Sequence, residues 1–221
     1  MKEPIVAFLI CFAITIVCVL TQSAGSPVSD ITWLCAVLSL IAVPLIFVRR
    51  IHPRDEAEAG VVISWSWRDF LTGVITVAIL LIPVALGNHF LRTAILGMDF
   101  QLNLDNYSRL ETPLYYEIPI QFLCVAMPEE FFYRGYFQTA MLKYFRSKPK
   151  FTKAAPALAI ALASYAFALA HLPSGNITRL LTFFPGLLFG AIRYRTGGLI
   201  GAIVCHACCN LMMVVLNVHY F

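Results

Sequence analysis

Two adjacent carboxylates and an arginine interrupt an otherwise apolar stretch of the sequence, at Glu129, Glu130 and Arg134. The apolar segment around them covers roughly residues 114–145. A charged side chain at the centre of a membrane helix costs about 2.5–3.5 kcal/mol to insert, so these groups must face protein or water rather than lipid. Charges retained at that cost indicate a functional site.

The spacing of the three residues predicts different environments for the two carboxylates. On a helix Glu130 and Arg134 stand at i and i+4 and can form an ion pair, whereas Glu129 is rotated about 100° away. We therefore expect Arg134 to neutralise Glu130 and Glu129 to act as a general base wherever it meets water. Taken alone, the three residues also fit a charge cluster that only holds helices together. Pro128 is compatible with a membrane helix, because neighbouring groups can satisfy the freed carbonyl.

Three other polar side chains lie deep in apolar runs, namely His171, His206 and Asn210. His206 and Asn210 stand at i and i+4, on one face of a helix. A lone intramembrane histidine is more often a packed, hydrogen-bonded residue than a catalytic one. Combined with a carboxylate pair, the three residues predict a functional site. Cys205 and Cys208 form a CxxC spacing, which on a membrane helix favours helix packing over redox or metal chemistry.

The composition indicates an integral membrane protein with an all-α fold. Of 221 residues 60% are hydrophobic, against ~45–50% in soluble domains, and the mean hydropathy is +0.79. Runs of apolar residues long enough to cross about 30 Å of hydrocarbon predict a polytopic bundle of about seven spans in a single domain. These runs cover residues 4–21, 31–48, 70–91, 114–142, 154–171, 177–192 and 197–218.

The distribution of basic residues predicts the orientation of the chain. Of the 16 Lys and Arg residues, most fall in alternate loops, at Lys2, 49–68, 143–153 and 193–195. By the positive-inside rule, the amino terminus is then cytoplasmic and the carboxyl terminus lies outside. The net charge of +4 follows this topology and gives no indication of nucleic-acid binding.

Two segments allow more than one interpretation. Residues 4–20 are expected to be a membrane anchor, although the small residues at 23–26 are also typical of a signal-peptide cleavage site. Residues 87–112 are expected to form a surface loop on the outer side, with a lid over an active site as the alternative.

The charged and polar residues carry a resemblance to a known family. The chain resembles the CAAX-protease and bacteriocin-processing group, or Abi proteins, which are glutamic-type intramembrane endopeptidases. The family's EExxxR motif matches residues 129–134, its FxxxH motif matches Phe167 and His171, and its HxxxN motif matches His206 and Asn210. Each motif alone is weak evidence, but the ordered set, each on its own apolar run, is specific.

The resemblance implies a mechanism and a division of the chain. Glu129 with His171 would orient and deprotonate a water molecule, and His206 with Asn210 would donate hydrogen bonds to the tetrahedral oxyanion. Glu130 and Arg134 would support the helix. The protease core would span residues 113–221, from spans four to seven, and residues 1–112 would form variable amino-terminal spans. No cofactor or metal is expected, and the expected partners are the lipid bilayer and a membrane-anchored protein or peptide substrate.

Three other classes of function remain open. A zinc enzyme would use His171, His206 and a glutamate as ligands, although the sequence lacks HExxH. A non-catalytic bacteriocin-immunity protein, or a transporter with a proton relay, would also retain charges in the bilayer.

The substrate class also has several candidates. They are a prenylated CAAX protein, a bacteriocin or pheromone precursor, an immunity-related target and a protein with a carboxyl-terminal sorting anchor. The short chain resembles bacterial members of the group, which implies the inner membrane. Residues 183–190 resemble sorting-type members, and Glu129 lies ~20 Å along the helix from Lys143, in the outer half of the bilayer. Both points favour sorting-anchor processing.

Overall fold

The computed structural model describes residues 2–23, 28–102, 107, 110 and 112–220. Within these residues all regular elements are helical, and the one β-bridge joins Phe100 to Tyr220. The α-helices are α1 (Lys2–Ser23), α2 (Val28–Ile46), α3 (Glu56–Ala59), α4 (Trp67–Phe90), α5 (Leu114–Pro119), α6 (Met127–Glu130), α7 (Gln138–Arg146), α8 (Ala155–Leu169), α9 (Phe183–Thr196) and α10 (Ile200–Asn217). The predicted all-α class is confirmed.

Segments of π-helix, which is wider than an α-helix, and of 3-10 helix, which is tighter, extend or join these helices. The π-helical segments are η1 (Phe47–Ile51), η2 (Leu91–Ile95), η4 (Ile120–Ala126) and η5 (Phe131–Phe137), and the 3-10 segments are η6 (Pro149–Phe151), η7 (Leu172–Ser174) and η8 (Ile177–Thr182). Two of the π-helical segments, η4 and η5, flank α6, so that helical structure runs without interruption from Leu114 to Arg146. The helix is therefore not broken at Pro128. Such π-helical turns occur frequently at functional sites.

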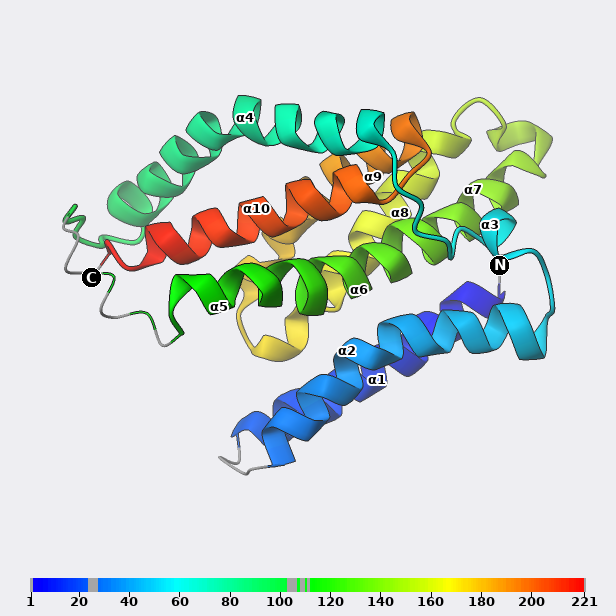
Figure 1. The fold of residues 1–221 in the computed structure, drawn as a ribbon, viewed down its shortest axis with the longest axis horizontal. Helices are drawn as coiled ribbons and strands as arrows, with labels where there is room; N and C mark the ends of the chain where they lie inside the picture. The colour runs from blue at the N-terminus through cyan, green and yellow to red at the C-terminus, as the bar shows by residue number, and fades with distance from the viewer. Residues whose placement is uncertain (1, 24–27, 103–106, 108–109, 111, 221) are drawn as a thin grey trace.

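The helices form one antiparallel pair beside a larger bundle (Figure 1). Helices α1 and α2 pack along each other. Helix α2 also contacts α6 and η5, which belong to the continuous helix from Leu114 to Arg146, called the central helix below. On the other side, α10 packs against α4, α9 and η4, while α8 packs against α7 and α9. The two ends of the described chain lie at opposite ends of the molecule (Figure 1). The middle of the central helix, α6 and η5, thus contacts α2, α8, α9 and α10.

Close backbone contact between α4 and α10 sets the position of α10. A Cβ atom on Gly73 of α4 would lie 2.6 Å from the carbonyl oxygen of Gly201, so only glycine fits this crossing. Small residues at a membrane helix interface allow the backbones to approach in this way. The contact fixes the beginning of the helix that carries His206 and Asn210.

Four helices in the described residues are long and apolar enough to cross a membrane. They cover Lys2–Thr21, Ile31–Ile51, Trp67–Ile95 and Ile200–Asn217. The helix from Leu114 to Arg146 is longer than any of these but includes Glu129, Glu130 and Arg134. Helices α8 and α9 have 15 and 14 residues, shorter than the usual span of about 20. All seven predicted spans are therefore mainly helical, but they differ in length and polarity.

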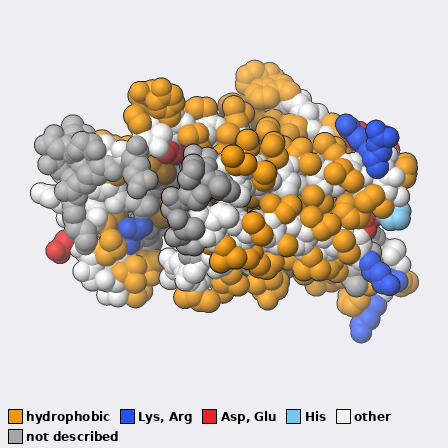
Figure 2. All heavy atoms as spheres, turned by 90° about the horizontal axis from the view of Figure 1, so that it is seen from below, with side chains coloured by type: hydrophobic (Ala, Val, Ile, Leu, Met, Phe, Trp, Pro, Cys, Tyr) orange, Lys and Arg blue, Asp and Glu red, His pale blue; other side chains and the backbone are white. Residues whose placement is uncertain are grey.

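Apolar side chains cover the middle of the molecular surface. In Figure 2, which views the molecule from below, they form a continuous band, and Lys and Arg gather mainly at the end where Figure 1 shows α3 and the end of α7. Many large apolar side chains are exposed, among them Leu9 and Leu34. That the basic end faces the cytoplasm stays a prediction from the positive-inside rule.

Two predictions fall wholly or partly outside the described residues. The small-residue stretch at 23–26 is described only at Ser23. The loop or lid at 87–112 is described only in part, and the prediction is wrong for residues 87–95, where α4 continues into η2. In its described part, the backbone of Gln101 pairs with the backbone of His219 just after α10.

Candidate active site

Glu130 and Arg134 form a fully buried ion pair at the centre of the bundle. Arg134 Nη1 donates to Glu130 Oε1 over 3.0 Å, and both side chains are 0% exposed. Arg134 Nη2 also donates to the carbonyl oxygen of Gly186 on α9. A Cβ atom added to Gly186 would lie only 3.1 Å from this Nη2 atom. The guanidinium lies over the rings of Phe167 at 4.3 Å and Phe189 at 5.3 Å. Arg134 therefore joins the central helix to α8 and α9, and the predicted pairing with Glu130 is present.

Glu129 occupies a different environment from its neighbour. Its side chain is 21% exposed, and its Oε2 atom lies 3.7 Å from His206 Nε2, too long for a hydrogen bond. In the described structure Oε2 is buried and has no hydrogen-bond partner. Glu130 Oε2 also has no hydrogen-bond partner in the described structure, but Glu130 is fully buried and paired with Arg134, whereas Glu129 is partly exposed and has no such pair.

His206 connects the two glutamates. Its Nδ1 atom is 2.8 Å from Glu130 Oε1, and its ring stacks on Phe189 with centroids 4.8 Å apart and planes at 14°. An ionised carboxylate only accepts hydrogen bonds, so Nδ1 carries the hydrogen and donates it. The other ring nitrogen, Nε2, is therefore the atom presented to Glu129.

The charges of this buried cluster balance with one additional proton. Two ionised carboxylates and Arg134 carry one net negative charge between them, and an unpaired buried charge is strongly unfavourable. One added proton, on either Glu129 or His206, makes the cluster neutral. The two side chains face each other at 3.7 Å.

His171 lies just past the end of α8 and is held by its own helix. Its Nδ1 atom donates to the carbonyl oxygen of Phe167 over 2.8 Å, so the neutral ring has its lone pair on Nε2. The ring of Phe167 packs edge-on against both histidines, with centroids 4.7 Å from His171 and 5.7 Å from His206. The structure therefore brings the two histidines to the same aromatic ring.

Asn210 lies one helical turn beyond His206 and contacts a residue that the sequence analysis did not select. Its Nδ2 atom donates to Gln121 Oε1 over 3.0 Å, and Gln121 Nε2 donates to Glu117 Oε2 over 3.2 Å. The available signal was a polar pair at i and i+4 at the beginning of an otherwise apolar segment. Its relevance could not be recognised from sequence, because the partner residue is on another helix.

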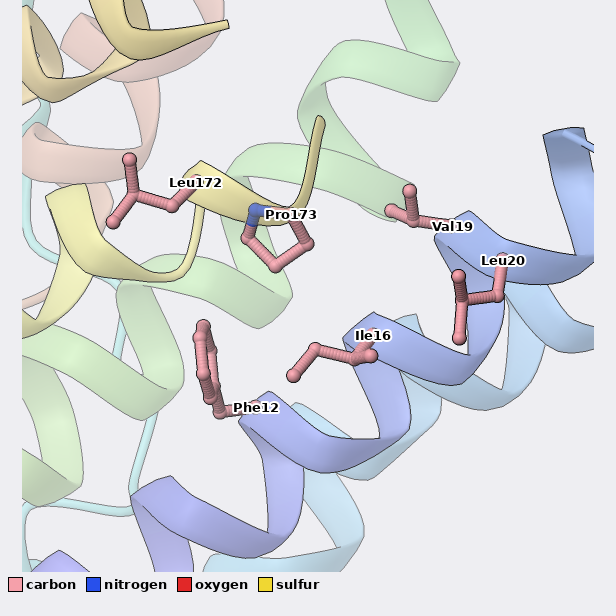
Figure 3. Close-up of a pocket in the computed structure, with 6 residues that line it drawn as sticks. All are labelled: Phe12, Ile16, Val19, Leu20, Leu172 and Pro173. Carbon is pink, nitrogen blue, oxygen red and sulfur yellow. The ribbon is translucent and has the colours of Figure 1, made fainter. Parts of the chain in front are cut away.

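An apolar pocket of about 300 Å³ opens beside the segment that follows His171. Figure 3 shows that one wall comes from α1 and the other from η7. The lining residues are Phe12, Ile16, Val19, Leu20, Leu172 and Pro173. The pocket can hold an apolar group beside the segment that follows His171.

The zinc alternative requires at least three metal-ligating side chains close together. Across the described ranges, no three or more His, Cys, Asp or Glu side chains gather in a group that could hold a metal ion.

Comparison with known proteins finds one similarity in this region. A family model described as type II CAAX prenyl endopeptidase, Rce1-like, matches residues 111–212. This part of the chain is similar to the Rce1-like family. The Rce1-like match begins just before α5 and ends in α10, so it includes all residues of the candidate site. Searches of curated proteins and of solved structures found no match.

The match to this family model supports a CAAX-type membrane endopeptidase, a hydrolase of peptide bonds. The apolar helices agree with an integral membrane protein.

Proposed function

We propose that this protein is a glutamic-type intramembrane endopeptidase in which Glu129 is the general base. The observation that carries the proposal is the contrast between the two glutamates. Glu130 is fully buried and is paired with Arg134 and His206 through its Oε1, while Glu129 is partly exposed and has a buried oxygen 3.7 Å from His206 Nε2. Protonation of Glu130 would disrupt its buried ion pair with Arg134, whereas protonation of Glu129 leaves that pair intact.

In the proposed reaction, Glu129 and His171 orient a water molecule near the scissile carbonyl. Glu129 removes a proton as the water oxygen bonds to the carbonyl carbon, and the carbonyl oxygen becomes an oxyanion. His206 Nε2–H and the Asn210 amide donate to this oxyanion, a contribution of ~3–4 kcal/mol per donor in a water-poor site. Breaking the C–N bond releases the amine, which receives the proton from Glu129.

The proposed roles agree with the net charge of the buried cluster of Glu129, Glu130, Arg134 and His206. An ionised Glu129 beside a protonated His206 gives the neutral form of the cluster. In that form Glu129 is ready to accept a proton, and His206 Nε2 carries the hydrogen that an oxyanion needs. Glu130 and Arg134 are proposed to hold His206 in this tautomer and to fix the central helix.

We further propose a membrane-anchored peptide or protein as substrate. The matched model describes prenyl endopeptidases, and the pocket between α1 and η7 could receive an apolar part of such a substrate. Prenylated CAAX proteins and proteins with a carboxyl-terminal sorting anchor are the two candidate classes. Residues 113–221 are proposed as the protease core and residues 1–112 as supporting spans. The bacterial inner membrane, with a cytoplasmic amino terminus, is the proposed location.

The test compares the wild type with Glu129→Gln in liposomes, using prenylated and unprenylated membrane-anchored peptides. Gln keeps the shape of Glu but cannot accept the proton, so we expect cleavage to fall at least a thousandfold while the protein stays folded. Glu56→Gln, an exposed carboxylate on α3, is the matched control and should cleave at the wild-type rate. Cleavage that survives in Glu129→Gln would falsify the role of Glu129. Loss of wild-type activity on chelation, restored by zinc, would instead identify a metalloprotease.

A further inference from the structure

A chain of hydrogen bonds leads from the outer part of the central helix to Asn210. Glu117 on α5 and Gln121 in η4 stand at i and i+4, and α10 packs against both segments. The chain consists of two bonds, Gln121 Nε2 to Glu117 Oε2 at 3.2 Å and Asn210 Nδ2 to Gln121 Oε1 at 3.0 Å. All three side chains are half-buried, whereas the neighbouring Tyr115, Tyr116 and Ile118 are exposed.

The chemistry of Glu117, Gln121 and Asn210 determines the direction of both hydrogen bonds. An ionised carboxylate only accepts, so Glu117 requires the NH₂ end of the Gln121 amide. The Gln121 oxygen then points toward Asn210, which must in turn present its NH₂ end. In the opposite orientation, the oxygens of Asn210 and Gln121 would face each other. The negative charge of Glu117 therefore determines, through one intermediate amide, which end of Asn210 faces the central helix.

We propose that Gln121 is a positioning residue for the reaction, with Glu117 as its anchor. This inference rests on the proposed function, in which Asn210 donates to the oxyanion. An amide nitrogen has two hydrogens, and the bond to Gln121 uses one of them. The second hydrogen remains for the oxyanion, in a direction fixed by the first. Without Gln121, Asn210 can rotate and can offer its oxygen, an acceptor, to a developing negative charge.

The hydrogen bonds through Gln121 predict a change in kcat rather than in KM when this residue is replaced. Donation to the oxyanion matters in the transition state, so a misplaced Asn210 lowers kcat and leaves KM nearly unchanged. We expect Gln121→Met, which has similar volume and no amide, to lower kcat by about tenfold, since small misplacements near the reacting atoms can reduce rates up to a hundredfold. The double variant Glu117→Gln with Gln121→Glu exchanges the two groups, so that the amide at position 117 donates to the carboxylate at position 121 and Asn210 keeps its acceptor; it should recover kcat to within about threefold of wild type.

The decisive experiment is a double-mutant cycle on kcat with Gln121→Met and Asn210→Ala. If Gln121 acts through Asn210, Gln121→Met has no further effect in the Asn210→Ala background. A merely structural role would lower kcat by the same factor in both backgrounds, or would raise KM, and either result overturns the inference. Full activity of Gln121→Met or of Asn210→Ala also overturns it. Thermal unfolding of each variant in detergent shows that the fold is intact.

Glu129→Gln is measured in the same assay to separate this inference from the proposed function. An inactive Glu129→Gln together with an unaffected Gln121→Met removes only the positioning role. An active Glu129→Gln removes the proposed function itself.

Discussion

Two of the arginine–glutamate pairs in the described structure have the same chemistry in opposite surroundings. Arg134 and Glu130 pair at 3.0 Å in the centre of the bundle, with both side chains 0% exposed. Arg49 and Glu56 pair at 2.6 Å at the basic end of the molecule, with side chains 56% and 39% exposed. Solvent can replace the partner of a surface charge, but nothing replaces the partner of a buried one. The buried pair is therefore an obligatory unit, whereas the exposed pair is dispensable.

The same contrast applies to the two glutamates of the site. Glu130 is fixed by two partners and has no exposed surface, while Glu129 retains exposed surface beside it. Adjacent positions in the sequence thus have distinct roles because successive residues on a helix point in directions about 100° apart.

Removing one partner of the buried pair should have the largest effect on stability. Arg134→Met leaves Glu130 charged and buried with only His206 beside it, and we expect a loss of about 3–5 kcal/mol. Thermal unfolding in detergent measures this loss. The double variant Glu130→Gln with Arg134→Met removes the unpaired charge but keeps an acceptor for His206, so it should be more stable than Arg134→Met alone. A double variant less stable than the single one would contradict this account.

A backbone contact extends the comparison from charges to packing. On α4, a Cβ atom at Gly73 would meet the backbone of Gly201, whereas one at Gly87 meets nothing within 4 Å. We expect Gly73→Ala to destabilise the protein by about 1–3 kcal/mol, because α4 and α10 must separate. Gly87→Ala is the matched control on the same helix, and its Tm should stay near that of wild type. An equal change of Tm in the two variants would show that the contact between Gly73 and Gly201 does not limit the stability of the protein.

Breaking the exposed pair should have the smallest effect on stability, and this effect should disappear in strong acid. The hydrogen bond from Arg49 lowers the pKa of Glu56 below its ordinary value. A lowered folded-state pKa stabilises the protein above the ordinary pKa of glutamate, and this contribution is lost as the pH falls through the lowered value. We expect Arg49→Ala to change the Tm by at most about 1 °C at neutral pH, with no difference from wild type in strong acid. A large shift at neutral pH would show that the exposed pair resembles the buried one.

Part of the fold and the site follows from the sequence alone. The apolar content predicts an all-α membrane protein, and the i, i+4 spacing predicts the pairing of Glu130 with Arg134. Both predictions are confirmed by the structure. Contacts of this kind depend only on the geometry of a single helix, which is the same in every protein.

Contacts between helices were decided by the tertiary structure. Sequence spacing could not show that His206 Nε2 approaches Glu129 while Nδ1 bonds to Glu130, nor that Phe167 separates two histidines. It also gave no reason to select Gln121, whose partner Asn210 is 89 positions away in the chain. These contacts depend on how each helix is rotated about its axis and on how closely neighbouring helices approach, as at Gly73 and Gly201. Rotation and approach are set by the packing of the whole bundle, and no local pattern in the sequence determines them.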